Sequence, residues 1–155
     1  VPRRESRPLG GQRRGASRKR GGRPMTGSPG KARGRCMCGR VRFVARFPSR
    51  FACHCHCESC RRAHSAGFVT WIGFPAAQVT IEAGNDDLAA YESSPGTKRS
   101  FCRACGTRLF FQSDRWAGET HVALAAFDDP VDRAPDRHAF FEEHVGWIPW
   151  PDAGA

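Results

Sequence analysis

The segment FACHCHCESCRRAHSAGF, residues 51–68, places four cysteines and three histidines between Cys53 and His64. Thiolates and imidazoles at such short spacing are the ligands that zinc prefers in proteins. Two further cysteine pairs lie outside this segment, one before it and one after it, and each pair is followed by a glycine. The chemistry that this sequence suggests is therefore metal binding through sulfur, and the question is how the thiols divide into sites.

The pair Cys102 and Cys105, in FCRACG, has the C-x-x-C-G spacing of a zinc knuckle. The turn brings both thiolates to one point, and Gly106 tolerates the positive φ that such a turn needs. A closed structural zinc site needs four ligands, so a second pair must contribute. We expect Cys36 and Cys38, in RCMCG, to supply it and to tie the first strands of the fold to later ones.

The remaining cysteines, Cys53, Cys55, Cys57 and Cys60, allow two interpretations. All four could form a second closed site, or only the last three could bind metal. In a straight strand Cys53 and Cys57 would lie about 13 Å apart, which a tetrahedral zinc with bonds of about 2.3 Å cannot bridge. We therefore favour three thiolates gathered by a bend after Cys57, with an open fourth position that is typical of a catalytic zinc.

The polar residues beside these cysteines are weaker candidates. His54 and His56 alternate with the cysteines, so in a strand they should point to the opposite face and bind no metal. His64 follows Cys60 by four residues and is expected at the surface, with a proton shuttle or a fourth ligand as the alternative. Arg61 and Arg62 are either plain surface residues or residues that bind a substrate carboxylate.

Charge divides the chain into two parts. Residues 1–33 hold eleven Arg and Lys against one acid, whereas residues 34–155 hold fourteen bases and fourteen acids. The first part is rich in Gly, Pro, Ser and Arg, which predicts a disordered basic tail. Nucleic-acid binding could reside only in this tail, and we favour a tail without such a role. A misplaced gene start is a further alternative, since Met25 lies near the edge of the folded part.

The rest of the chain, residues 34–155, is predicted to be a single, mainly β domain. Short alternating or β-branched segments such as 40–47 and 67–74 recur between turn signals, and one helical turn is expected near 58–63. No secretory signal is visible, and no apolar run is long enough for a bilayer span. Clustered cysteines without an export signal indicate a reducing, cytoplasmic setting in which zinc is favoured over disulfides.

The order of the motifs resembles one known family, the glutathione-dependent formaldehyde-activating (GFA) family, which includes the centromere protein V-like proteins. The motifs that carry this resemblance are GRCMCGRVRF, CHCESCRR, GFVTWIGFP, YESSPGTKRSFCRACGTRLFF and LAAFDDP, over roughly residues 33–150. The resemblance implies an Mss4-like β fold with two Zn²⁺ ions per chain. It implies a structural site at Cys36, Cys38, Cys102 and Cys105 and a catalytic site at Cys55, Cys57 and Cys60.

The same resemblance implies a carbon–sulfur lyase acting on a thiol–aldehyde adduct such as S-hydroxymethyl-glutathione. Cys53 and the basic tail lie outside the family's motifs, and Cys53 could compete for the catalytic zinc. We expect the open zinc to bind a substrate thiol as thiolate and to polarise the carbonyl oxygen. The alternative is a zinc-binding module without catalysis that docks a protein or nucleic acid. A fourth protein ligand, from Cys53 or His64, would favour the module.

Overall fold

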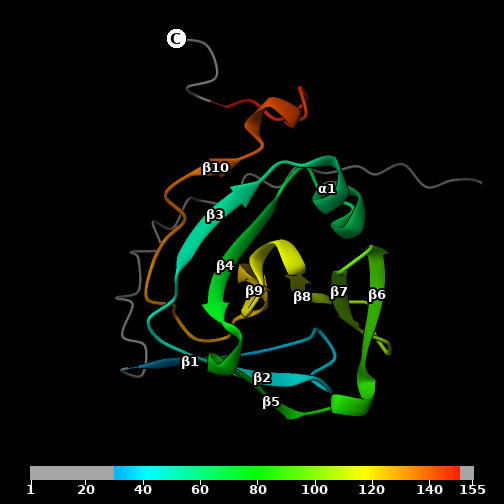
Figure 1. Cartoon of the computed structure of the whole chain (residues 1–155), viewed down its shortest axis with the longest axis vertical. Helices are drawn as coiled ribbons and strands as arrows, with labels where there is room; N and C mark the ends of the chain where they lie inside the picture. The colour runs from blue at the N-terminus through cyan, green and yellow to red at the C-terminus, as the bar shows by residue number, and fades with distance from the viewer. Residues whose placement is uncertain (1–29, 151–155) are drawn as a thin grey trace, which may run out of the picture.

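The computed structural model of the chain describes residues 30–150, which form two β-sheets and one short helix (Figure 1). The smaller sheet has the strand order β1-β2-β5, and the larger has the order β10-β3-β4-β9-β8-β7-β6. This confirms the prediction of a mainly β fold in a single domain. The predicted disordered tail falls almost wholly on residues 1–29, outside the described part of the chain.

The smaller sheet forms from the first alternating segments. Its strands are antiparallel, and they are β1 (Lys31–Arg35), β2 (Arg42–Arg46) and β5 (Val79–Ala83). Phe43 and Ala45 of β2 are fully buried, as the alternation of the sequence predicts. Strand β1 begins at Lys31, three residues before the boundary expected at Gly34, because the alternating residues Ala32 and Gly34 already pair with β2.

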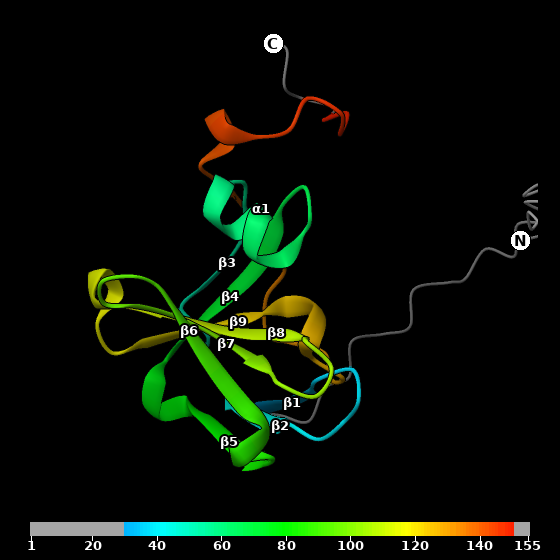
Figure 2. The same cartoon turned by 90° about the vertical axis from the view of Figure 1, so that its right-hand side faces the viewer.

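The larger sheet is antiparallel except where its edge strand β10 runs parallel to β3. Figure 2 shows its strands β3, β4, β8 and β9 on one side of the smaller sheet of β1, β2 and β5. Its strands, in spatial order, are β10 (His138–Ala139), β3 (Phe51–Cys55), β4 (Val69–Pro75), β9 (Glu119–Ala123), β8 (Arg108–Ser113), β7 (Thr97–Cys102) and β6 (Leu88–Ser94).

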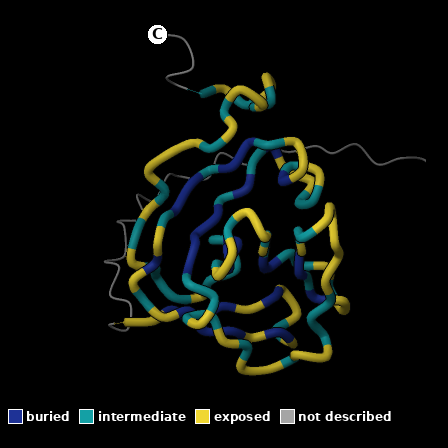
Figure 3. Tube along the Cα trace, in the orientation of Figure 1, coloured by how far each residue is buried: buried dark blue, intermediate teal, exposed yellow. Residues whose placement is uncertain are grey.

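One hydrophobic core lies between the two sheets. Phe43 of β2 packs edge-on against Phe110 of β8 and Phe127, with ring centroids 5.1 and 5.2 Å apart. Ile72 and Phe74 of β4 are fully buried in the same cluster. Figure 3 shows that burial concentrates along β3 and β4, whereas the outer strand β6 is mostly exposed. A second, smaller buried cluster includes Cys53, Cys55, Cys60 and Trp71.

The helix α1 (Glu58–His64) follows β3 directly, where one helical turn was predicted. Cys57 caps its N-terminus, since its sulfur accepts a hydrogen bond from the Cys60 backbone N–H. Short 3₁₀ turns complete the fold: η1 (Ala76–Gln78), η2 (Asn85–Asp87), η3 (Asp114–Trp116), η4 (Leu124–Ala126) and η5 (Phe141–Glu143). Within residues 30–150, no helix has the length and apolar character needed to cross a membrane.

Strand register aligns one row of side chains across the outer face of the larger sheet. Phe51 pairs with Gly73, Gly73 with His121, His121 with Phe111, and Phe111 with Arg99. Partners in register point to the same side of a sheet, so these residues share a face with the alternate positions of β3. Two of those β3 positions are Cys53 and Cys55, so this face of the sheet joins β7, β8 and β9 to the thiols of β3.

Candidate metal centres and pocket

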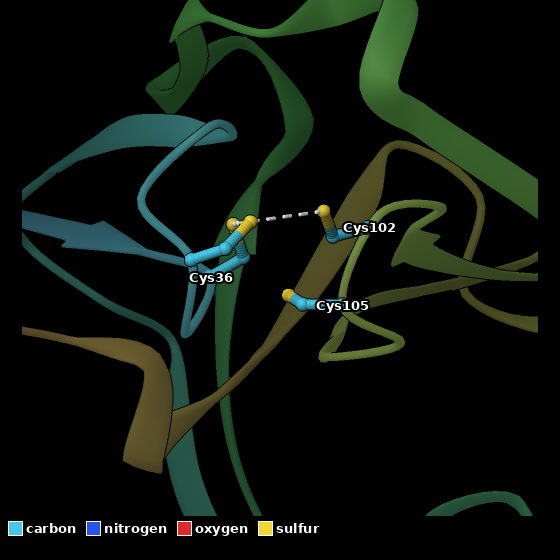
Figure 4. Close-up of side chains that lie close together, drawn as sticks. Cys36, Cys102 and Cys105 are labelled. Atoms are coloured by element: carbon cyan, nitrogen blue, oxygen red, sulfur yellow. Dashed lines mark hydrogen bonds between the residues drawn. The ribbon is translucent and has the colours of Figure 1, made fainter.

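The first thiol group joins two distant turns. Cys36 and Cys38 come from the turn between β1 and β2, and Cys102 and Cys105 come from the end of β7 and the turn after it. Their four Sγ atoms lie within 4.8 Å of one another. Figure 4 shows Cys36 on one side of the gap facing Cys102 and Cys105 on the other. The structure therefore brings together the four residues that the sequence predicted as one site.

The spacing in this group suits a tetrahedral metal. The Cys36–Cys38 and Cys38–Cys102 sulfur separations are 3.4 and 3.8 Å. Bonds of about 2.3 Å to a tetrahedral ion place sulfur atoms about 3.8 Å apart. The turns are built for this arrangement, since Gly39 and Gly106 adopt φ values of 77° and 75°. Four ligands complete a tetrahedron, so this group can hold a metal but leaves no position for a substrate.

The second thiol group comes from one short segment. Cys55 ends β3, Cys57 caps α1, and Cys60 lies in the first turn of that helix. Their Sγ atoms again lie within 4.8 Å of one another, with Cys55 and Cys57 3.5 Å apart. The bend between strand and helix gathers them, as the spacing predicted. In the described part of the chain, no further Cys, His, Asp or Glu joins this group.

Cys53 is buried on the same face of β3 but lies outside the group of three. Burial raises the pKa of its thiol, which keeps it neutral at pH 7. His54 and His56 point away, as predicted: the His54 ring bonds the Thr70 hydroxyl at 2.9 Å, and His56 is fully buried beside His138. The strand thus separates ligand candidates from these histidines by simple alternation.

His64 is also outside the group, because its ring packs edge-on against Trp71 at 5.2 Å. Burial lowers the pKa of His64 to about 4, so its imidazole is neutral at pH 7. Neither Cys53 nor His64 therefore supplies a fourth ligand in this arrangement, although both were open candidates from the sequence.

A pocket of about 530 Å³ opens beside the group of three. Cys55, Cys57 and Cys60 line it together with Cys53. Its aromatic and basic lining comprises Phe51, Trp71, Phe111, Trp116, Phe140, Arg99, Arg115 and Arg137. A larger hollow of about 770 Å³ lies beside the first thiol group. The smaller pocket is the candidate substrate site, because it borders the group with three ligands.

Arg61 and Arg62 do not line this pocket. The Arg61 Nε donates to the His56 carbonyl at 2.8 Å, and Arg62 pairs with Glu58 one helical turn earlier. The arginine that faces the cysteines is Arg99, which reaches them from β7. The geometry gives no support to the expectation that Arg61 and Arg62 hold a substrate in this pocket.

Arg99 is 8% exposed and contacts the group of three directly. Its Nη1 donates to the Cys60 sulfur at 3.6 Å, and its Nε donates to the Ser93 hydroxyl at 3.1 Å. Its guanidinium lies over the Phe111 ring at 4.9 Å. Hydrogen bonds from Cys55 and Cys57, together with Arg99, lower the pKa of Cys60 to about 2 despite its burial. Hydrogen bonds to Cys57 and Cys60 raise the pKa of Cys55, so the negative charge belongs to Cys60, the sulfur that faces Arg99.

The far wall of the pocket holds an imidazole paired with a carboxylate. The His121 Nε2 lies 3.0 Å from Glu119 Oε2, and the same carboxylate accepts a hydrogen bond from Arg50 at 2.6 Å. Burial lowers the pKa of His121, although Glu119 opposes that shift. Burial would raise the pKa of Glu119, but its bonds to His121 and Arg50 hold it below its ordinary value. A neutral imidazole beside an ionised carboxylate is suited to moving a proton.

Sequence reasoning missed Arg99, His121 and Glu119. The alternation of TKRSFC and ETHVA does place Arg99 on one face of its strand and His121 with Glu119 on one face of theirs. That signal does not say which strands pair, and Arg99 lies 39 residues from the cysteine it contacts. Only the register of β7, β8 and β9 brings these residues to the pocket.

The sequence of this chain matches the model of a known protein family. Residues 31–143 match the family model described as glutathione-dependent formaldehyde-activating enzyme (GFA). The chain belongs to the GFA family. The match covers both thiol groups and every strand of the two sheets.

Individual proteins also resemble this GFA-family chain. A Schizosaccharomyces pombe protein described as an uncharacterized lyase is 33% identical over 78 residues, which is 50% of this chain. The match spans 55% of that relative, so about half of its length. A crystal structure of a Rhodobacter sphaeroides protein superimposes with a TM-score of 0.55 at 22% identity, covering 69% of this chain and 99% of that one. The latter likeness concerns the fold alone.

Proposed function

We propose that this GFA-family chain is a zinc-dependent carbon–sulfur lyase that makes or breaks the adduct of a thiol and an aldehyde, such as S-hydroxymethyl-glutathione. The observation that carries the proposal is the group of Cys55, Cys57 and Cys60 at a pocket of about 530 Å³, with no fourth protein ligand among residues 30–150. Three protein ligands and a neighbouring pocket are typical of a catalytic metal rather than a structural one.

The donor set supports zinc as the metal, since groups of thiolates select zinc over the harder divalent ions. When bound, zinc would supply a Lewis acid that lowers the pKa of a thiol held beside it. The four thiols of Cys36, Cys38, Cys102 and Cys105 would hold a second, structural zinc. Two ions per chain with different tasks follow from this proposal.

The residues around the pocket would bind and orient the substrate. Trp71, Phe111 and Phe140 offer apolar surface for the carbon atoms of the adduct and limit access of water. Arg115 and Arg137 are exposed at the lining and would attract carboxylate groups of a thiol such as glutathione. Such contacts would leave the sulfur of the substrate facing Cys55, Cys57 and Cys60.

The proposed reaction forms or breaks one carbon–sulfur bond. In the forward direction the sulfur lone pair attacks the aldehyde carbon, the π pair of the carbonyl moves to oxygen, and that oxygen gains the proton which the thiol loses. His121, paired with Glu119, is the imidazole on the pocket wall that can accept and return this proton. The reverse direction uses the same steps, so no oxidant or reductant is needed.

The test is turnover of hydroxymethyl-thiol adducts by the isolated protein. A panel of glutathione, cysteine and a neutral thiol, each mixed with formaldehyde, is assayed for the rate of adduct formation and breakdown. We expect acceleration that disappears on removal of zinc and in Cys57→Ser. A fully metal-loaded protein that accelerates none of these reactions would contradict the lyase and favour a binding module.

A further inference from the structure

The starting observation is a buried positive charge without a carboxylate partner. Arg99 is 8% exposed, and within residues 30–150 no Asp or Glu oxygen lies within 4.0 Å of its guanidinium. The one acidic residue that lines the pocket, Glu119, is already paired with Arg50 and His121. A buried charge is costly unless it is paired, so Arg99 must find its counter-charge elsewhere.

The contacts of Arg99 identify that counter-charge. Its Nε donates a hydrogen bond to the Ser93 hydroxyl, and its guanidinium lies over the Phe111 ring. Both of these partners are neutral. Its Nη1 points at the Cys60 sulfur at 3.6 Å. The thiolate group is therefore the one anionic partner of Arg99 in the described part of the chain. Arginine is the basic side chain that proteins favour in buried ion pairs.

The net charge of the metal centre makes the Arg99–Cys60 contact relevant to which fourth ligand the metal prefers. A divalent ion with three thiolates carries one net negative charge, and a thiolate as fourth ligand raises this to two. Such a build-up of charge in a half-buried site is unfavourable unless a fixed cation offsets it. A neutral fourth ligand, such as water or imidazole, adds no charge and needs no offset.

We propose that Arg99 is the internal counter-ion of the Cys55–Cys57–Cys60 centre and that it makes this centre select an anionic sulfur ligand over a neutral one. This inference rests on the proposed function, because it takes the fourth position of the metal to be open. Arg99 acts through Cys60 and does not touch the reacting atoms, so it is a positioning residue. A residue of β7 would thus adjust the ligand preference of a metal centre held by β3 and α1.

The experiment compares two ligands on the full chain loaded with cobalt(II), whose visible spectrum changes when a ligand enters an open position. The probes are 2-mercaptoethanol, which binds as thiolate and releases its proton to solvent, and imidazole, which binds neutral. In Arg99→Gln we expect the affinity for 2-mercaptoethanol to fall about 10-fold to 100-fold, as outer-sphere changes at metal sites typically do. The affinity for imidazole should stay unchanged, and Arg99→Lys should restore most of the preference for sulfur.

Arg108→Gln is the matched control. The Arg108 guanidinium also lies over an aromatic ring, that of Phe101 at 4.6 Å, but Arg108 does not line this pocket. It should leave both affinities unchanged, because the same loss of charge then occurs away from Cys55, Cys57 and Cys60. If Arg99→Gln loses its native circular dichroism, Arg99→Met replaces it, since that variant places no unpaired polar group beneath Phe111.

The outcomes separate this inference from the proposed function. If the wild-type centre takes neither probe, its fourth position is closed, and both the lyase and the selection fail. If the wild type binds 2-mercaptoethanol and Arg99→Gln binds it equally well, the lyase stands and the inference alone is wrong. Equal losses for both probes would make Arg99 a packing residue and would also overturn the inference.

Discussion

At the scale of single residues, the difference between Cys53 and its three neighbours decides what the pocket can do. Cys53 lines the same pocket and is buried, yet its sulfur does not belong to the group of three. Cys57 belongs because it lies past the end of β3, where the chain turns into α1. A thiol two residues before Cys55 on a straight strand has no such bend to bring it closer.

We therefore predict that Cys53→Ser keeps both metal ions. Serine has almost the same shape as cysteine, and the loss of a buried sulfur should cost only about 1 kcal/mol of stability. Metal content per chain and circular dichroism on the purified variant measure this. Loss of one zinc per chain would show that all four thiols form a closed cluster, and the lyase would give way to a binding module.

At the scale of elements, the register of β3, β4 and β9 shapes the pocket wall. Gly73 lies between Phe51 and His121, whose rings meet edge-on at 4.8 Å across it. A Cβ at Gly73 would lie 2.2 Å from the Phe51 ring, which real structures do not allow. Because Gly73 has no side chain, Phe51 of β3 and His121 of β9 can meet across β4 and form one wall of the pocket.

Gly73→Ala should destabilise the fold by about 1–3 kcal/mol and displace Phe51, because the added methyl overpacks a rigid ring. Thermal unfolding measures the first effect, and adduct turnover, where present, measures the second. Gly146→Ala is the control, since nothing lies within 4 Å of a Cβ at that position. Equal melting temperatures for the two variants would contradict the assigned packing.

The first thiol group acts between elements as well, since it joins the β1–β2 turn to the β7–β8 turn. Cys102→Ser should lose that metal and unfold the domain. A structural zinc contributes on the order of 10 kcal/mol to folding, which is comparable with the whole stability of a small domain. Denaturant unfolding of Cys102→Ser measures this. Cys53→Ser is the control, because it makes the same substitution outside both thiol groups. A Cys102→Ser variant as stable as Cys53→Ser would rule the structural role out.

At the scale of the whole molecule, most of the net charge precedes the fold, because only Lys31 and Arg33 among the eleven bases of residues 1–33 lie in β1. Residues 34–155 carry as many acids as bases, and the net charge of +10 resides in residues 1–33. Any binding to nucleic acid should therefore depend on the N-terminal residues and fall steeply with salt. Deletion of residues 1–24 should abolish such binding in a titration with duplex DNA while zinc content stays the same. Salt-sensitive binding that survives the deletion would place the nucleic-acid site on the folded part.

The sequence predicted the thiol groups better than the pocket, for a physical reason. Ligand spacing and strand alternation are local, so Cys55, Cys57 and Cys60 could be separated from Cys53 without knowing the fold. Turn chemistry likewise paired Cys102 with Cys105. Arg99 could not be predicted, because its contact depends on the pairing of strands far apart in sequence. Arg61 and Arg62 illustrate the converse, since adjacency in sequence to Cys60 does not bring them to the pocket.

The central claim is that Cys55, Cys57 and Cys60 hold a metal whose purpose is chemistry rather than folding. The most direct measurement is the zinc content of Cys57→Ser alongside its circular dichroism and its turnover of S-hydroxymethyl-glutathione. The three ligands come from one short segment and close no long loop, so their loss should cost little stability. We predict one zinc per chain instead of two, a native spectrum and no turnover. Two retained zinc ions, or a variant that unfolds as Cys102→Ser is expected to, would contradict the account.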